Sequence, residues 1–408
     1  MTHRPYDLVI LGATGFTGQL VAQYLMKRYG MGGDLHWAIA GRSQTKLEEL
    51  KQRLGSPELP IVVADNHDRA SLDALCEQTH VVCSTVGPYA LHGDAVVAAC
   101  VASGTDYCDL TGEVPWMARM LDRYSEEAVT SGARIVHCCG FDSVPSDMGV
   151  AFLQDKAKAS LGEPLVEIRM GVEAMRGAMS GGTAASMVNI IQEANKDPQV
   201  KKTLSNPFAL CPQGQRSGSK QPYVKGPVWN PSLGSWLAPF IMAAINTRVV
   251  HKSHALRGHS WGEDFRYEEA MMTGPGFKGR RRAWMLSLAL GGFAVGASLS
   301  PVRRLMQKTF LPKPGEGPSP QAQEKGFFKL KFVGQTADGR VMAARVTGDR
   351  DPGYGSTAKM LGEAAVCLAT QCPQSEVAGG FWTPSTALGQ AYQERLTQNA
   401  GLTFECLD

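Results

Sequence analysis

Three glycines near the start of the chain, Gly12, Gly15 and Gly18, are spaced so that they could hold a phosphate group. They follow residues 8–11, an apolar run typical of a parallel strand covered on both faces, and precede a helical pattern at residues 19–26. In this arrangement the glycines permit a tight turn, backbone approach to a pyrophosphate, and close packing of the helix, whose N-terminus faces the phosphates. The pattern predicts a dinucleotide site formed by Gly12, Ala13, Thr14, Gly15, Phe16, Thr17 and Gly18.

A second predicted strand, within residues 36–43, ends at Gly41 and is followed by Arg42 and Ser43. Domains that prefer NAD place Asp or Glu here to bind the ribose hydroxyls. A guanidinium instead pairs with a 2′-phosphate and stacks on adenine. Arg42 and Ser43 therefore predict NADP as the cofactor, with Lys46 within reach; the alternative is that Arg42 is a solvated loop charge.

Two further strand ends complete the predicted cofactor site. Residues 60–65 indicate a third strand, whose terminal Asp65 could accept a hydrogen bond from the adenine amine. Residues 81–89 indicate a fourth strand, ending in Val86, Gly87 and Pro88. Ligands of open α/β sheets bind outside the carboxyl ends of the strands, so we expect this end to run under the ribose and nicotinamide.

The proton donor for a reduction is less clearly marked. No tyrosine is followed by a lysine four residues later, which disfavours the short-chain dehydrogenase mechanism. Tyr89, just past the fourth strand, and Asp142, at the end of a sixth, are our candidate catalytic residues. The alternative for Tyr89 is that it only lines the pocket. Ser143 is a candidate substrate contact, or else a cap of the helix that begins near Pro145.

A second glycine-rich helix start lies at residues 181–183, before the helical run 184–194. Backbone amides there, together with the Thr183 hydroxyl, could hold a thioester or a carboxylate, which makes Gly182 and Thr183 candidate substrate residues. The equally acceptable alternative is a flexible turn with Thr183 as an ordinary N-cap.

The elements that must position these residues predict an α/β fold in two domains. Residues 1–145 read as a doubly wound parallel sheet of the Rossmann type, with further strands at 105–110 and 134–142. Residues 146–408 read as a mixed α/β substrate domain, because 165–172 and 328–332 alternate like strands of a largely antiparallel sheet and 356–370 is helical. Residues 206–326 are expected to be a loop-rich insert, with loops at 206–235 and 311–326.

An uncharged apolar segment, residues 283–299, lies within that insert. It is preceded by Arg280, Arg281 and Arg282 and followed by Pro301, Arg303 and Arg304. As a helix it would span about 25 Å, short of a hydrocarbon core of about 30 Å. Basic residues at both ends suit a segment whose ends stay on one anionic face, so we expect peripheral membrane contact or a lid over an apolar channel; the alternative is a core helix.

Composition excludes several classes of function. A net charge of +3 over 408 residues, with no long basic run, argues against nucleic acid as a partner. The ten cysteines show no C-x-x-C spacing and are expected to be reduced core residues of a cytoplasmic protein. His137, Cys138 and Cys139 lie on one predicted strand with alternating side chains, so we expect no metal. No signal peptide is indicated before the first strand, and a homodimer is left open.

Several motifs together resemble one family, the saccharopine dehydrogenase-like oxidoreductases, which include the trans-acting enoyl reductases of polyketide-lipid assembly. The resemblance spans nearly the whole chain, and its two long motifs, GFDSVPSD and GGFWTP, are its most specific parts. It implies a Rossmann domain followed by a mixed α/β domain, NADP use and a lipid-linked substrate. The matching motifs are GATGFTG at 12–18, AGRS at 40–43, VGPY at 86–89, DLTGE at 109–113, GFDSVPSD at 140–147 and GGFWTP at 379–384.

Three functions follow from these observations. The first is an NADP-dependent, enoyl reductase-like oxidoreductase acting on a lipid or acyl thioester, with the enolate stabilised near Tyr89 or residues 181–183. The second is a saccharopine-type imine reductase acting on an amino-acid adduct, which would need clustered cations for the carboxylates. Arg169, Arg176 and Lys220 are too scattered in the sequence to indicate such a cluster. The third is a non-catalytic NADP-binding protein at a lipid surface.

Overall fold

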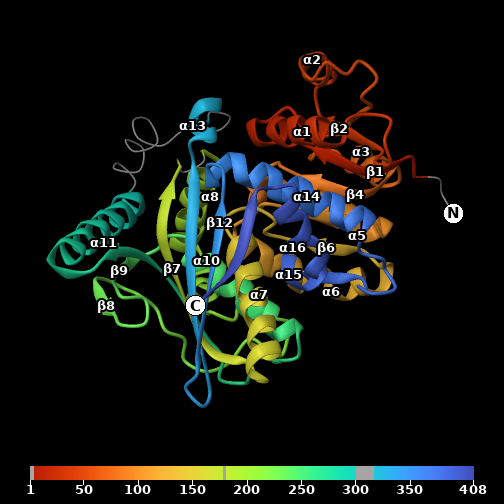
Figure 1. The fold of residues 1–408 in the computed structure, drawn as a ribbon. Coiled ribbons are helices and arrows are strands. Elements are labelled where there is room, and N and C mark those ends of the chain that lie inside the picture. Colours follow the sequence, from red (N-terminus) through yellow and green to blue (C-terminus); the bar gives the residue numbers. More distant parts are fainter. Residues whose placement is uncertain (1–3, 178–180, 300–316) are drawn as a thin grey trace.

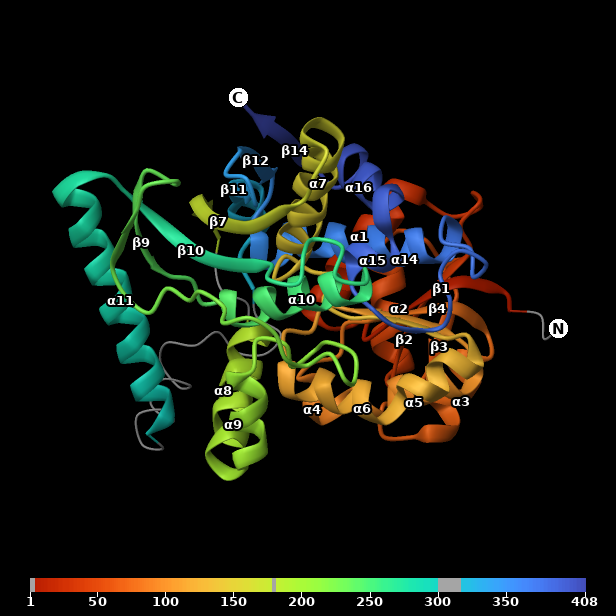
Figure 2. The ribbon, with the colours of Figure 1, turned by 90° about the horizontal axis from the view of Figure 1, so that it is seen from below.

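The computed structural model describes residues 4–177, 181–299 and 317–408, which form two seven-stranded sheets surrounded by helices (Figure 1). In the view from below, the first sheet lies to the right and the second to the left, with α10 near the centre (Figure 2). The expected α/β architecture with two sheets is confirmed.

The first sheet, sheet A, is parallel throughout. The chain runs outward from the centre through three strands and then returns to build the other half, so the strand order reverses between β1 and β4. Ligands bind at such a switch point. The strands, in spatial order, are β13 (Gly380–Trp382), β6 (Arg134–Val136), β5 (Asp106–Asp109), β4 (Thr79–Ser84), β1 (Tyr6–Leu11), β2 (Trp37–Gly41) and β3 (Ile61–Val63).

Helices cover both faces of sheet A, which explains why its strands are continuously apolar. Leu8 and Ile10 of β1 belong to one hydrophobic core and Val9 and Leu11 to another, because successive side chains of a strand point to opposite faces. The first core is closed by α1 (Phe16–Tyr29), α2 (Gln44–Arg53), α14 (Thr357–Thr370) and α16 (Gly389–Gln398). The second is closed by α3 (Arg69–Cys76), α5 (Asp94–Ser103) and α6 (Val114–Ser131).

The C-terminal part of the chain also contributes to sheet A. Strand β13 pairs with β6, and α14 packs against β1, β4 and β5. The sheet is therefore not complete at residue 145, where we expected the first domain to close. The sixth strand is also shorter than expected, because β6 ends at Val136 and Cys138 adopts a left-handed backbone conformation with φ of 66°.

The second sheet, sheet B, is mixed but largely antiparallel, as expected. Its long central strand β7 pairs in parallel with β10 and antiparallel with β11. Helices α7 (Val144–Leu161) and α10 (Ala243–Leu256) pack against it. The strands, in spatial order, are β14 (Leu402–Leu407), β12 (Val341–Gly348), β11 (Phe327–Thr336), β7 (Leu165–Arg176), β10 (Arg266–Gly274), β9 (Ser235–Pro239) and β8 (Val228–Asn230).

The expectation that residues 206–326 form a loop-rich insert needs correction. This stretch supplies three strands of sheet B and two long helices, so it is an integral part of the second domain. Its elements are short or contain glycine and polar residues, which weakened the periodic signal. Residues 206–227 do form a loop, and the described part of the expected loop 311–326 contains the short helix α13 (Pro320–Glu324). Pro301, Arg303, Arg304 and residues 311–316 lie outside the described residues. The remaining elements are α4 (Tyr89–His92), α8 (Gly181–Lys196), α9 (Pro198–Ser205), α11 (Gly276–Ser298), α13 (Pro320–Glu324), η1 (Pro352–Ser356) and α15 (Pro384–Ala387).

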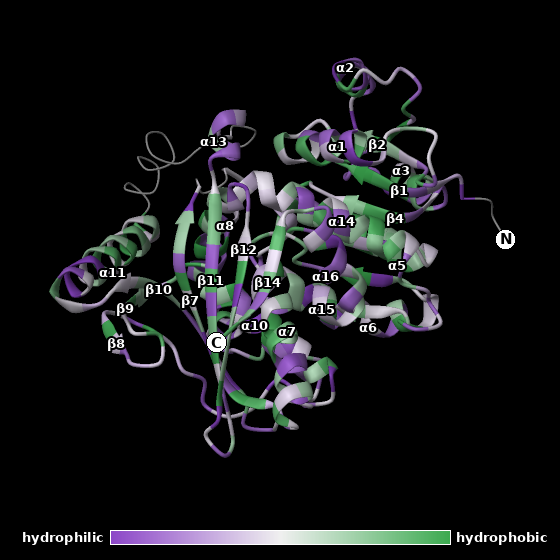
Figure 3. Cartoon of the chain, viewed as in Figure 1, coloured by the Kyte–Doolittle hydropathy of each residue, from purple (hydrophilic) through white to green (hydrophobic). Residues whose placement is uncertain are grey.

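The apolar segment lies on α11, which begins before the segment, at Gly276, and stands at the outer edge of sheet B (Figure 2). Only its small residues Gly279, Ala283 and Ala297 are buried, and it is apolar along most of its length outside the arginine cluster (Figure 3). It is therefore not a core helix. In the described residues no helix is both long and apolar enough to cross a membrane.

The two long sequence motifs meet in a buried network that joins the C-terminal segment to α7 and α10. The carboxylate of Asp147, in GFDSVPSD, accepts hydrogen bonds from the Ser385 amide at 2.8 Å, the Ser385 hydroxyl at 2.9 Å and the Ser253 hydroxyl at 2.5 Å. Ser253 also contacts the hydroxyl of Thr383, in GGFWTP, at 2.6 Å. These motifs are therefore structural at this end, since they fix the C-terminal segment against α7 and α10.

Candidate active site

A cavity of about 220 Å³ lies at the switch point of sheet A, where the carboxyl ends of β1 and β4 face the second domain. Its floor comes from the glycine turn after β1 and the loops after β4, β5 and β6, and α8, η1 and Met242 form the opposite wall. The side chains that line it are mostly apolar or hydroxyl-bearing. They include Phe16, Thr17, Thr85, Tyr89, Leu110, Thr111, Phe141, Asp142, Thr183, Ser186, Met187, Ile190, Met242, Tyr354 and Thr357.

The glycine turn has the geometry that the sequence predicts. Gly12 has a φ of 85°, in the left-handed region that favours glycine. A Cβ on Gly18 would lie 2.2 Å from the Gly12 carbonyl oxygen, so only glycine lets α1 pack this closely against the turn. The turn and the helix are thus held in one fixed arrangement.

The N-terminus of α1 suits a bound phosphate. Gly15 is its N-cap and provides no side-chain cap, and Gly15, Phe16 and Thr17 all line the cavity. The first amides of a helix have no partners within the helix, and its dipole adds partial positive charge there. The residues present therefore fit the diphosphate of a dinucleotide.

The residues predicted to contact the adenosine half lie at neighbouring strand ends. Arg42 is exposed at the end of β2, and the Ser43 hydroxyl accepts a hydrogen bond from the Lys46 amide at 3.4 Å, which caps α2. Asp65 follows β3, and its carboxylate accepts from the His67 amide at 3.0 Å. None of these side chains lines the cavity itself, which extends from the diphosphate end of the site toward α8.

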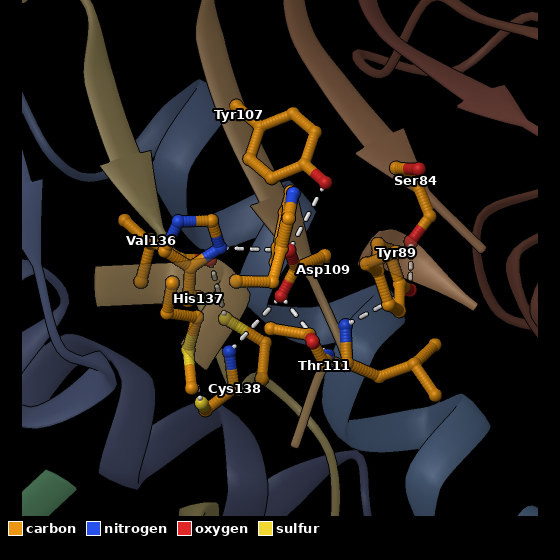
Figure 4. Close-up of polar contacts among 12 residues, drawn as sticks. Ser84, Tyr89, Tyr107, Asp109, Thr111, Val136, His137 and Cys138 are labelled. Atoms are coloured by element: carbon orange, nitrogen blue, oxygen red, sulfur yellow. Dashed lines mark hydrogen bonds and ion pairs between the residues drawn. The ribbon is translucent and has the colours of Figure 1, made fainter. Parts of the chain in front are cut away.

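Tyr89 is fixed by the backbone around it (Figure 4). Its hydroxyl donates to the Ser84 carbonyl at 3.0 Å and accepts from the Leu110 amide at 3.4 Å. Burial, followed by the charge of Asp109, raises the pKa of the phenol well above its usual value. Tyr89 therefore keeps its proton, and the proton is directed to a main-chain oxygen. Val86, Gly87 and Pro88 precede it, and Gly87 lines the cavity.

Asp142 is the one carboxylic acid among the described residues that line the cavity. Burial raises its pKa to about 6, and no hydrogen bond to its carboxyl group is recorded in the described part of the chain. Such a group is close to half protonated near pH 6 and can give a proton to a bound molecule. Asp142 does not end the sixth strand as expected, because β6 ends at Val136 and Asp142 lies in the turn before α7; its role as the catalytic acid stays a prediction.

The three predicted substrate residues separate into two groups. Gly182 and Thr183, at the start of α8, line the cavity opposite Asp142. Ser143 does not line it, because its side chain is buried and its hydroxyl donates to the Asn246 side chain at 3.3 Å. Ser143 therefore connects α7 to α10.

Glu113 was not singled out by the sequence as a site residue, although it ends the DLTGE motif. Its buried carboxylate accepts from the amides of Tyr89 at 2.8 Å and Ala90 at 2.9 Å, which caps α4. It also accepts from the hydroxyl of Ser186, on α8, at 2.6 Å. One carboxylate thus ties the cavity's two walls together.

A second buried network, centred on Asp109, lies next to Tyr89 (Figure 4). The Asp109 carboxylate contacts the Tyr107 hydroxyl at 3.0 Å and Nδ1 of His137 at 2.7 Å, and it accepts from the amides of Thr111 and Cys138. His137 also contacts the ring of Trp116, at 5.1 Å between ring centroids. This network fixes the loops after β5 and β6, which carry Thr111 and Asp142 into the cavity.

Comparison with known proteins gives consistent matches. Residues 8–136 match the family model described as the saccharopine dehydrogenase NADP binding domain. A Mycobacterium tuberculosis protein provisionally named a trans-acting enoyl reductase is 39% identical, over 99% of this chain and 98% of its own length. The trans-acting enoyl reductase of Mycobacterium ulcerans is 34% identical, over 97% and 96%.

Among solved structures, the saccharopine dehydrogenase (L-Glu forming) of Saccharomyces cerevisiae has a TM-score of 0.54 at 13% identity, covering 99% of this chain and 100% of the yeast chain. At this identity the match supports the fold. The family model and the sequence relatives together show NADP as the cofactor.

Proposed function

The chain belongs to the saccharopine dehydrogenase-like oxidoreductases and is an NADP-dependent reductase, and we propose that it reduces a carbon–carbon double bond of a lipid or acyl-thioester substrate. The observation that carries this proposal is the lining of the cavity. Among its described residues none is lysine, arginine or histidine, and several are apolar, such as Met187, Ile190 and Met242. An apolar wall suits an acyl chain.

The same lining disfavours the saccharopine-type alternative. An amino-acid adduct carries carboxylates, which are bound in proteins by arginine or lysine. A cavity without such cations would leave those charges buried and unpaired, at a cost of several kcal/mol. The relatives named enoyl reductases point to the same substrate class.

We assign NADP to the sheet edge that the sequence predicted. Residues 12–18 would hold the diphosphate, Arg42 and Ser43 the 2′-phosphate, and Asp65 the adenine. The loop from Val86 to Pro88 would lie under the ribose and nicotinamide. When bound, the nicotinamide supplies the hydride, and the protein supplies position and protons.

The residues of the chain divide the remaining work. Asp142 would protonate the substrate carbon next to the thioester carbonyl, since its pKa, raised to about 6, leaves it close to half protonated near pH 6. The α8 start, with Thr183, would donate to the thioester oxygen, where negative charge develops. Tyr89 would keep the β4 loop in place, because its hydroxyl binds the main chain. Met187 and Ile190 would exclude water.

The test is NADPH oxidation by the full-length protein with three kinds of substrate: enoyl thioesters, lipid ketones and amino-acid imines. We expect turnover with enoyl thioesters, increasing with acyl chain length. Turnover with amino-acid adducts alone would support the saccharopine-type alternative. Binding of NADPH, measured by calorimetry, without turnover of any substrate would support the non-catalytic protein at a lipid surface.

We also propose that α11 contacts a membrane surface peripherally. Phe277, Trp284, Leu288 and Val295 recur at spacings of seven, four and seven, which place them on one helix face, and their exposed fractions range from 50% to 79%. Exposed apolar area of this kind is typical of an interaction site. Arg280, Arg281 and Arg282 extend from the same helix and would attract anionic lipids.

Sedimentation with anionic vesicles tests the α11 proposal. Replacing Phe277, Trp284 and Leu288 by glutamine should release the protein from vesicles, because these side chains face solvent and their loss leaves the fold intact. The matched control replaces Val129 and Val341, which are exposed elsewhere, and should leave binding unchanged. Equal vesicle binding by both variants would contradict the proposal. The homodimer stays a prediction, to be tested by light scattering.

A further inference from the structure

A second cavity, which we call the basic groove, lies at the start of α10. It has a volume of about 800 Å³ and is formed by the end of α9, the loop 206–223 and the first turns of α10. Four cationic side chains line it, Lys202, Arg216, Lys220 and Arg248, and none of its described lining residues is Asp or Glu. The folded chain thus brings Lys220, isolated in the sequence, next to other cations.

The four cationic side chains of the basic groove differ in their interaction partners. The Arg248 guanidinium is buried and donates to the carbonyls of Asn206, Ala244 and Leu204, which holds the loop to α10. Arg216 forms an ion pair with Asp122 at 2.5 Å. Lys202 and Lys220 are exposed, and neither ammonium group has a partner within the described residues. These two charges remain available to a ligand.

The loop between Arg216 and Lys220 reads RSGSK and forms one wall of the groove. The backbone amides of residues 217–220 have no hydrogen-bond acceptor in the described part of the protein. Gly218 is packed against Phe208, whose ring would lie 2.7 Å from a Cβ at this position, so the loop is anchored. Amides, the hydroxyls of Ser217 and Ser219, and cations together form a donor set for a phosphate.

The groove and the active-site cavity are lined by consecutive residues at the start of α10. Met242 lines the active-site cavity, and the next two residues, Ala243 and Ala244, line the basic groove. An elongated molecule that passes the start of α10 would contact both. Acyl thioesters of 4′-phosphopantetheine carry the acyl group at one end and a phosphate at the other, which matches an apolar cavity and a cationic groove lined by consecutive residues of one helix start.

We propose that the basic groove, through Lys202, Lys220 and the amides of residues 217–220, binds the phosphate of a phosphopantetheine-type substrate whose acyl end enters the active-site cavity. The proposal rests on the proposed function for the identity of the acyl end. The phosphate itself could belong to a free coenzyme or to the arm of a carrier protein, since both present the same group.

Calorimetric titration of the full chain with 4′-phosphopantetheine and with unphosphorylated pantetheine tests the groove without any turnover. We expect the phosphorylated compound to bind about tenfold more tightly at low salt, with the difference shrinking as salt rises. Lys202→Gln and Lys220→Gln should each remove much of that difference. The controls Lys201→Gln and Lys225→Gln, which change exposed lysines outside the groove, should not.

Equal affinity for the two compounds, or equal losses in the control variants, would overturn the proposal. Turnover of an unphosphorylated pantetheine enoyl thioester separates the two ideas, because it tests the reductase function without the groove. If it is turned over while the phosphate brings no gain, the groove fails and the reductase stands. Coenzyme A that binds no more tightly than phosphopantetheine would point to a carrier-protein arm, and tighter binding to the free coenzyme.

Discussion

The two sheets differ in how far apart in the sequence their paired strands lie. Within residues 6–136, sheet A is built from strands that follow one another with one or two helices between them. Sheet B instead pairs β7 with β10, which comes after α8, α9 and α10, and with β11, which comes after α11 as well. The cofactor half is therefore specified by local motifs, whereas the substrate half exists only after distant segments have assembled. Each half should respond differently to substitution.

Gly18→Ala should have the largest effect, because it attacks the local framework of sheet A. The new Cβ would meet the Gly12 carbonyl oxygen at 2.2 Å, and backbone cannot yield as a side chain can. We expect the free energy of unfolding to fall by about 3 kcal/mol and NADPH binding to be lost. Gly33→Ala, where a Cβ has ordinary contacts, is the control for thermal unfolding and calorimetry. Equal stability of the two variants would remove the distinction between a rigid turn and an ordinary loop.

Asp142→Asn should leave the framework intact and affect the chemistry. We expect kcat to fall by about 10²–10⁴-fold with NADPH affinity unchanged, because only the proton is lost. In the wild type, kcat should fall as pH rises through about 6, where the donor ionises. A variant that keeps both the rate and this pH profile would exclude Asp142 as the acid.

Arg42→Ala should weaken NADPH binding about 10- to 100-fold, since a hydrogen bond to a charged group contributes about 1.5–3 kcal/mol. NADH, which lacks the 2′-phosphate, should bind as before. Lys51→Ala, in the last turn of α2, controls for a general loss of positive charge. If NADPH and NADH lose equal affinity, Arg42 is not the phosphate ligand.

Asp142 should also make a small contribution to pH-dependent stability. Its folded pKa of about 6 lies above the ordinary value of 3.8, so the contribution is present below about pH 4 and is lost as pH rises through 6. The resulting change in the free energy of unfolding is at most about 3 kcal/mol. Denaturation at pH 4 and pH 7 should show a smaller difference in Asp142→Asn than in the wild type, and an unchanged difference would contradict the burial of this carboxyl.

The sequence predicted the parts of the molecule whose geometry depends on near neighbours. The roles of Gly12 and Gly18 follow from one strand, one turn and one helix, and the structure has all three in place. Asp142 was expected at the end of the sixth strand but lies in the turn that follows it, because β6 ends at Val136. Ser143, one residue later, was expected in the site but faces Asn246, because helix α7 turns it toward α10.

The opposite wall of the cavity could not be predicted in this way. Ile190, Met242 and Tyr354 line it from three separate elements, and nothing in their local sequence indicates that they meet. Glu113 belongs to a motif that was noticed, yet its bond to Ser186 depends on how α8 packs. The short strand β13 was not predicted either, because a strand of three residues gives no periodic signal.

The pairing of β13 with β6 has a consequence for how the protein is made. As the chain leaves the ribosome, the nucleotide-binding sheet is nearly complete early, but one border keeps its amides and carbonyls unpaired until residues 380–382 emerge. Unpaired strand edges of this kind pair with other chains, so we expect the nascent protein to need protection from aggregation during that interval. A fragment that stops at residue 145 should accordingly aggregate, even though it contains every nucleotide-binding motif.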